Sequence, residues 1–240
     1  MNQVIAILLL LASFCAGASR GVELDSVAID LDNKAALKRG ARLFVNYCQG
    51  CHSIKHLLYS RIASDLRLSD KEVARDLIVG SKTINDSMTT AMNRDEASPW
   101  FLGIGPPDLS LVARLRGSDW LYSYLRGFYL DESRPFGVNN RIYKDVAMPN
   151  VFGELQGLQN AVFKNVEGRP VFDRFESVKP GAMNREQFDA AITDLVNFLV
   201  YAGEPAKLQR ARIGKYVIFY LLIFLVLACL LKKEYWKDVH

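Results

Sequence analysis

The chain has 240 residues, half of them hydrophobic and 23% charged. This is enough for one ordinary domain with an appendage, and it excludes a large multidomain protein and a chain that is disordered throughout. The formal net charge is +4, but the residues from Lys207 onward contribute +5 and the remainder is near neutral at −1. A body without excess basic charge offers no electrostatic footprint for a polyanion, so nucleic acid is excluded as a partner.

The N-terminus has the pattern of a secretory signal peptide. Residues 4–11 form a short apolar core, and Ala16, Gly17 and Ala18 follow it as a small-residue cleavage site. We therefore predict that residues 1–18 are removed and that the body is exported.

The first predicted helix of the body covers residues 34–47, with apolar side chains at helical spacing, and two cysteines follow it directly. Cys48 and Cys51 are separated by two residues and followed by His52, which is the C-x-x-C-H sequence of covalent c-type haem attachment. Two thiols on one turn reach the two haem vinyl groups, and the histidine becomes the proximal iron ligand. A redox dithiol or a zinc half-site is the alternative, but a zinc site needs a second ligand pair, which the sequence lacks. His56 lies on the same side as His52 and cannot reach the opposite haem face.

The rest of the body is predicted to be mainly helical, with one small β-hairpin. A capping box opens a helix over residues 69–79, and periodic apolar residues indicate two more helices. Two strands around Glu167 and Gly168 are predicted to form the hairpin. The long irregular stretch 130–160 is expected to wrap the cofactor. The two further helices are predicted over residues 118–129 and 184–201, and the hairpin over residues 161–175.

A distal ligand has to come from a distant segment, and four methionines are candidates. Met88 and Met92 follow a helix-start signal at residues 85–87 and have a spacing that usually serves packing, and Met183 directly precedes a helix. Met148 precedes a proline, which restricts it to an extended conformation and stiffens the loop. Sequence mechanics favour Met148, and the other three remain alternatives.

The second apolar run, residues 216–231, is flanked by basic residues and by aromatic residues at interface positions. These features predict a transmembrane helix rather than a buried core helix. With the body exported, the predicted organisation is a haem domain over residues 19–206, a polar connector and membrane anchor over residues 207–231, and a cytoplasmic tail over residues 232–240.

Four segments together resemble the cytochrome c1 family, whose members are haem subunits of the quinol:cytochrome c oxidoreductase (cytochrome bc1) complex. The segments are Asn46–Ser53, Gly105–Ser110, Ala147–Pro149 and Gly203–Pro205 ahead of a single C-terminal span. The resemblance covers nearly all of the mature chain. It implies a class I cytochrome c fold with long insertions, one covalent haem c, and electron transfer from a Rieske iron–sulfur protein to a cytochrome c. Cytochrome b and the membrane are further implied partners, in a dimeric complex at a bacterial inner membrane with the haem domain in the periplasm.

The resemblance also implies roles for individual residues. Cys48 and Cys51 would hold the haem, His52 and Met148 would bind its iron, and Pro106 and Pro107 would pack against the ring on the His52 side. Arg114 and Arg116 resemble the propionate-binding arginines of the family, with Arg116 preferred. The apolar stretch 101–104 departs from the polar residues that many related chains have there.

Two other functions fit the same haem motif. A haem enzyme or gas sensor would leave the sixth coordination position open, and an anchored cytochrome could donate to a terminal oxidase. No Ser-His-Asp set, phosphate loop or carboxylate pair is present in the sequence, so we predict electron transfer and no catalytic residues in this chain.

Overall fold

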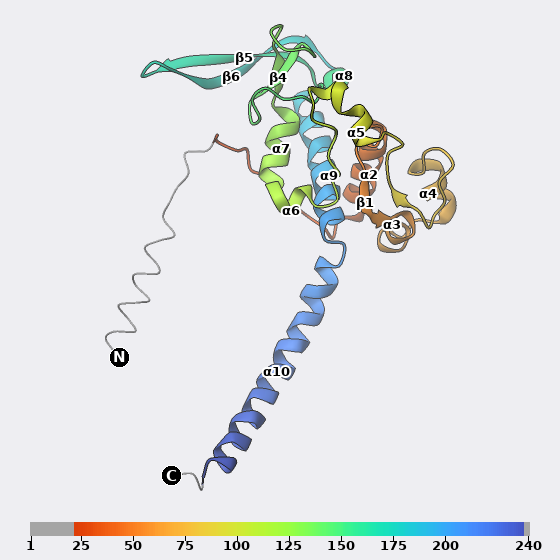
Figure 1. The fold of residues 1–240 in the computed structure, drawn as a ribbon, viewed down its shortest axis with the longest axis vertical. Helices are drawn as coiled ribbons and strands as arrows, with labels where there is room; N and C mark the ends of the chain where they lie inside the picture. Colours follow the sequence, from red (N-terminus) through yellow and green to blue (C-terminus); the bar gives the residue numbers. More distant parts are fainter. Residues whose placement is uncertain (1–21, 238–240) are drawn as a thin grey trace.

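The computed structural model describes residues 22–237, and Figure 1 shows a helical body from which one long helix extends. The predicted signal peptide, residues 1–18, and the last residues of the predicted tail lie outside the described part. The helices are α2 (Lys34–Tyr47), α3 (Tyr59–Leu66), α4 (Asp70–Asp76), α5 (Arg94–Ala97), η1 (Ser98–Phe101), α6 (Val112–Arg116), α7 (Ser118–Arg126), α8 (Gly153–Gln156), α9 (Arg185–Gly203) and α10 (Lys207–Tyr235). The strands form three antiparallel pairs: β1 (Ile54–Leu58) with β2 (Ser87–Met88), β3 (Phe128–Leu130) with β4 (Val138–Asn140), and β5 (Gly157–Val166) with β6 (Arg169–Pro180).

Helix α9 is the central element of the core and packs against α2, α6 and α7. It begins at a capping box in which Asn184 and Gln187 exchange side-chain hydrogen bonds with each other's backbone. The predicted apolar face is buried, and so are polar residues on other faces of the helix, including Asp194 and Asn197. Asp194 accepts hydrogen bonds from Arg39 of α2, and Asn197 accepts one from the backbone N–H of Asp30. The predicted helix is confirmed, and its burial extends around most of its circumference.

Helix α7 ends earlier than the predicted helix over residues 118–129. It stops at Arg126, and Phe128–Leu130 form strand β3 against β4. The reason lies in Asn140, whose side-chain amide donates to the Tyr124 carbonyl and so satisfies one acceptor at the helix end. Gly127 lies close to that asparagine and to the Ser123 carbonyl, and the chain turns there into the strand.

The region between α3 and β2 corrects two expectations. The capping box at Ser69 and Glu72 is present, but α4 ends at Asp76 and not at residue 79. The helix expected after residues 85–87 is absent from the described chain at that place, where Ser87 and Met88 form the short strand β2 against β1. Met88 is fully buried there, because its side chain fills the main core.

The hairpin of β5 and β6 is longer than predicted and reaches away from the body on the side opposite to α10 (Figure 1). Its tip carries exposed apolar side chains such as Val166 and Val171. The mainly α architecture with a long hairpin and one apolar C-terminal helix is confirmed, and the two short strand pairs β1–β2 and β3–β4 are additions that the sequence patterns did not predict.

Helix α10 is a single helix of 29 residues with a mean hydropathy of 2.4 over its most apolar window and no buried residue in that window. By length and composition it is a candidate membrane span. The polar connector expected before the span is itself helical, so body and span are joined by a short turn at Glu204–Ala206. Glu204 forms ion pairs with Arg210 at 2.6 Å and with Arg114 at 3.7 Å, which tie the start of α10 to α6.

The contact between α2 and α9 depends on Gly40, because an added Cβ there would overlap the backbone carbonyl of Asp194. We expect Gly40→Ala to lower the free energy of unfolding by about 1–2 kcal/mol, since overpacking costs about 1–3 kcal/mol and the better helix propensity of alanine returns up to about 1 kcal/mol. Denaturant unfolding of the haem-loaded protein in detergent measures this, and the larger Gly40→Ser should cost more. A stabilised Gly40→Ala variant would show that the helices separate without cost.

Candidate functional site

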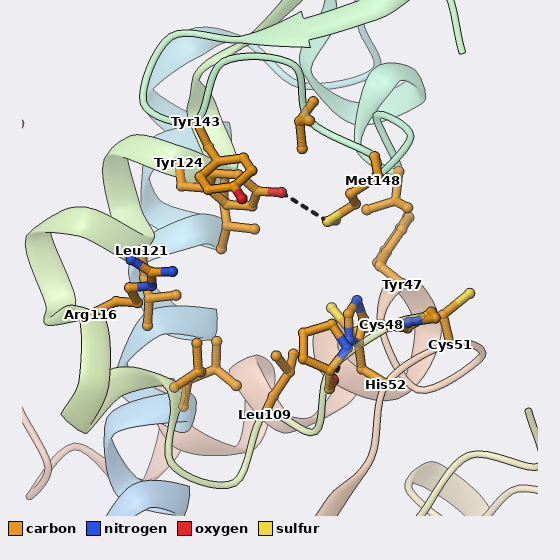
Figure 2. A pocket seen from close by; sticks show the side chains of 18 of the residues that line it. Tyr47, Cys48, Cys51, His52, Leu109, Arg116, Leu121, Tyr124, Tyr143 and Met148 are labelled. Atoms are coloured by element: carbon orange, nitrogen blue, oxygen red, sulfur yellow. Dashed lines mark hydrogen bonds between the residues drawn. The ribbon is translucent and has the colours of Figure 1, made fainter. Parts of the chain in front are cut away.

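A cavity of about 330 Å³ opens in the body between α2, α7, α9 and two long loops. Figure 2 shows the Cys48–His52 segment on one wall and Met148 on the opposite wall. Apolar side chains dominate the lining, and the predicted irregular stretch contributes Tyr143 and the residues 146–149. A cavity with an apolar lining and few convergent polar groups is the usual form of a cofactor site.

The cysteines are placed by the end of α2. The backbone N–H of Cys48 donates to Phe44, and those of Cys51 and His52 both donate to the Cys48 carbonyl, which closes a tight turn. Both sulfur-bearing residues line the cavity. Burial, reinforced by the neighbouring Cys51, raises the pKa of the Cys48 thiol to about 12. Burial therefore favours the protonated thiol, which lies against the cavity.

The imidazole of His52 is oriented by a single hydrogen bond from Nδ1 to the Pro107 carbonyl at 2.8 Å. A carbonyl can only accept, so Nδ1 carries the proton and Nε2 keeps its lone pair free. Burial lowers the pKa of His52, with the Pro107 bond and Asp108 opposing it, and this favours the neutral ring. A neutral imidazole whose other nitrogen donates to a carbonyl is the arrangement of a metal-ligating histidine.

The Pro107–Ser110 segment is bonded to the Cys51–His56 segment residue by residue. Leu109 donates its N–H to the Ser53 carbonyl at 2.7 Å, and Asp108 accepts the N–H of Lys55 at 3.0 Å. Ser110 accepts the N–H of His56 at 3.2 Å through its hydroxyl. The His56 side chain itself is exposed on β1, away from the cavity. The loop that presents the Pro107 carbonyl to the imidazole is therefore itself held in place by a ladder of hydrogen bonds.

Met148 is the one candidate distal ligand that lines the cavity. Met88 is buried in the core, and Met92 and Met183 lie elsewhere among the described residues; Met183 borders a second, polar cavity under the hairpin. Pro106 and Pro107 both line the cavity near His52, although Pro107 is exposed on its outer side.

Two buried asparagines shape the loop that carries Met148. Asn139 accepts the N–H of Asp145 at 2.8 Å, and Asn140 accepts those of Ile142 at 2.9 Å and Tyr143 at 3.3 Å. The Asn139 amide donates to Asp131 at 2.9 Å. Sequence reasoning missed both residues, although a pair of adjacent asparagines beyond Gly137 is a turn signal.

Tyr124 on α7 was also missed. Its hydroxyl donates to the Met148 sulfur at 3.4 Å, the contact drawn as a dashed line in Figure 2. Burial raises the pKa of Tyr124, with a contribution from the nearby Tyr143, so the hydroxyl keeps its proton.

The two arginines expected at the propionates have different positions. Arg116 lines the cavity, and its guanidinium lies 5.1 Å from the centre of the Trp120 ring. Within residues 22–237 it forms no salt bridge. Arg114 does not line the cavity; it faces Glu204 at 3.7 Å.

The residues of the cavity fit a haem of the c type. The donor set consists of two cysteine thiols on one turn, an imidazole with a free Nε2, and a thioether on the opposite wall. Arg116, which has no ion pair among the described residues, also lines the cavity. Apolar walls suit a porphyrin, and soft sulfur with imidazole suits its iron. Fold and site together have the form of a membrane-anchored c-type cytochrome.

The comparisons specify this class further. The chain belongs to the cytochrome c1 family, whose model matches residues 25–239. It is 46% identical to the cytochrome c1 of Allochromatium vinosum, over 99% of this chain and 98% of that protein. It is 43% identical, over 100% of this chain and 99% of the other, to a Nitrosomonas europaea protein named ammonia monooxygenase gamma subunit. The cytochrome c1 of Rhodospirillum rubrum is 26% identical over 85% of this chain and 81% of its own length. Members of the family carry one covalently bound haem c and transfer electrons within the bc1 complex.

The hydrogen bonds to Asp108 lead to a stability prediction. Burial raises the pKa of Asp108, but hydrogen bonds from Ser110 and Lys55 outweigh it and hold the pKa below its ordinary value. Asp108→Asn places an amide donor opposite backbone donors and should cost about 1–2 kcal/mol of unfolding free energy at pH 7, after allowance for solvent screening. The folded-state pKa of Asp108 is lowered, so its carboxylate adds to the unfolding free energy in full at pH values above the unfolded pKa of about 3.9. This contribution is lost as the pH falls through the lower folded-state pKa.

Denaturant unfolding of the haem-loaded protein at pH 7 and at acid pH tests this. Glu132→Gln serves as the control, because Glu132 is exposed and forms no hydrogen bond among the described residues. A difference between Asp108→Asn and wild type that is equally large at low pH would contradict the role of the carboxylate.

Proposed function

We propose that this chain passes single electrons from a Rieske iron–sulfur protein to a cytochrome c, through a haem bound by Cys48, Cys51, His52 and Met148. The observation that carries the proposal is the position of an imidazole and a thioether on opposite walls of one apolar cavity. His52 and Met148 would both bind the haem iron and leave no coordination site for a substrate, which is the requirement of an electron carrier and not of a haem enzyme or gas sensor.

The bound haem supplies a reversible one-electron couple between ferric and ferrous iron. The residues of the chain do the rest. Cys48 and Cys51 fix the group at the end of α2, and the Pro107 carbonyl holds the His52 ring with Nε2 toward the cavity. Apolar walls exclude water, which keeps the environment nearly unchanged when the charge changes by one unit. Arg116, in preference to Arg114, pairs with a propionate carboxylate.

The domain organisation belongs to the proposal as well. Residues 19–206 form an exported haem domain, residues 207–231 connect and anchor it, and residues 232–240 lie in the cytoplasm. The signal-peptide pattern and the apolar surface of α10 support this topology. The complex is proposed to be dimeric, with cytochrome b and the Rieske protein as partners.

A second candidate function comes from the relative named ammonia monooxygenase gamma subunit, which matches the whole chain. A haem held by the same cysteine, histidine and methionine residues could also deliver electrons to such an enzyme. The match to the cytochrome c1 family model over residues 25–239 favours the bc1 complex.

Both function and topology are tested in one preparation. Sealed spheroplasts supplied with quinol should reduce added cytochrome c, whereas inverted vesicles should not, because the haem domain faces outward. The complex purified from these membranes should contain cytochrome b and a Rieske protein. Reduction by inverted vesicles alone would refute the topology, and co-purification with monooxygenase subunits would favour the second candidate.

The ligand assignment has its own test. Met148→Leu should keep the haem attached, because attachment depends on the two cysteines, and should lower the reduction potential substantially, because a neutral soft ligand that favours ferrous iron is lost. Haem staining after denaturing electrophoresis and a redox titration measure the two effects. An unchanged potential would transfer the role to Met88, Met92 or Met183.

A further inference from the structure

Met148 has a polar neighbour that ligand binding alone does not require. The Tyr124 hydroxyl lies 3.4 Å from its sulfur, and this is the only hydrogen bond to that atom among the described residues. A buried hydroxyl needs an acceptor, and a thioether sulfur is a weak one. The pairing of the two is therefore a specific arrangement of this cavity wall.

The tyrosine ring is held in place by two neighbouring aromatic rings, and its backbone is held by a hydrogen bond. Trp120 stacks on it with ring centres 4.8 Å apart and planes 10° from parallel, and Phe128 meets it edge-on at 5.4 Å. The Tyr124 carbonyl accepts the Asn140 amide at 2.8 Å. A ring fixed in this way keeps its O–H directed at one point, the Met148 sulfur.

The hydrogen bond has a chemical consequence for a ligating sulfur. A thioether has two lone pairs, and a donor on one of them withdraws electron density from the sulfur. The sulfur then donates less strongly to ferric iron than it would alone, which favours the ferrous state and raises the potential. Groups that bond to a ligand in this way tune a metal site without touching the metal.

We propose that Tyr124 is a positioning residue for Met148, which holds the thioether toward the cavity and raises the reduction potential through its O–H···S hydrogen bond. This rests on the proposed function, in which Met148 is the distal ligand. Met148 is thus held in two ways: Asn139 and Asn140 support its loop, and Tyr124 donates a hydrogen bond to its sulfur.

The test is Tyr124→Phe in the full-length, haem-loaded protein, since this change removes one oxygen and keeps the ring packing. We expect the midpoint potential to fall, with the equilibrium constant against a fixed redox partner shifting at least threefold toward the oxidised form. This corresponds to about 28 mV at 59 mV per tenfold for one electron. The Met–iron charge-transfer band should remain but move, because the sulfur is a stronger donor.

Tyr122→Phe is the matched control. Tyr122 lies on the same helix and is also largely shielded from solvent, but it packs under the Arg126 guanidinium at 4.4 Å and does not line the cavity. The midpoint potential of the Tyr122→Phe variant should equal that of the wild type. An equal shift in both variants, or no shift in Tyr124→Phe, would overturn the proposal.

Incorporation of 3-fluorotyrosine at position 124 provides a second variant that keeps the hydroxyl and strengthens it as a donor. The potential should then rise above the wild-type value, and this decides the question if the phenylalanine variant does not fold; no rise overturns the proposal. Absence of the Met–iron band from the wild type would instead refute Met148 as ligand, and the present proposal with it. A normal band with unchanged potentials in the Tyr124 variants would refute this proposal alone.

Discussion

The site depends on the ladder of hydrogen bonds between residues 52–56 and 107–110. In this ladder, the His52 imidazole donates to the Pro107 carbonyl, and the Leu109 N–H donates to the Ser53 carbonyl. The Lys55 N–H donates to the Asp108 carboxylate, and the His56 N–H donates to the Ser110 hydroxyl. Each prolyl residue lacks an N–H, so the start of the loop has no backbone donor that needs an acceptor, and the proline rings can turn toward the cavity. The whole loop therefore sets the orientation of the imidazole ring, and the imidazole in turn would set the orientation of a cofactor bound to it.

The opposite wall is built on a different principle. No regular element carries Met148; its loop is held by side chains of Asn139 and Asn140, which replace the backbone partners that a strand or helix would supply. Both asparagines are almost fully buried, at 3% and 2% exposed, because each has to face backbone groups inside the loop. A stiff wall with a ligand on it suits electron transfer, since less rearrangement accompanies each change of charge.

Sequence patterns were sufficient where the interactions are local. The helices over 34–47 and 184–201, the capping box at Ser69 and the hairpin are confirmed because each depends on neighbours within a few residues. The helix expected at Met88 was wrong because this residue pairs with strand β1. The expected end of α7 was wrong because the Asn140 side chain bonds to the Tyr124 carbonyl and the helix stops there. The same holds for the site: spacing revealed the Cys48–His52 segment, whereas Tyr124 and the asparagines act across separations that periodicity does not encode.

The attachment of the anchor follows from the same packing. Helix α10 begins four residues after α9 ends, and α9 is the element on which α2, α6 and α7 all pack, so a membrane-embedded α10 is linked to the most buried part of the body. Glu204 strengthens this joint by pairing with Arg210 of α10 and with Arg114 of α6. Arg114 therefore has a partner that accounts for its charge, which leaves Arg116 as the arginine available to a carboxylate in the cavity. A short, braced joint limits how far the haem domain can move from the membrane, and this confinement raises its effective concentration toward a partner tethered in the same complex.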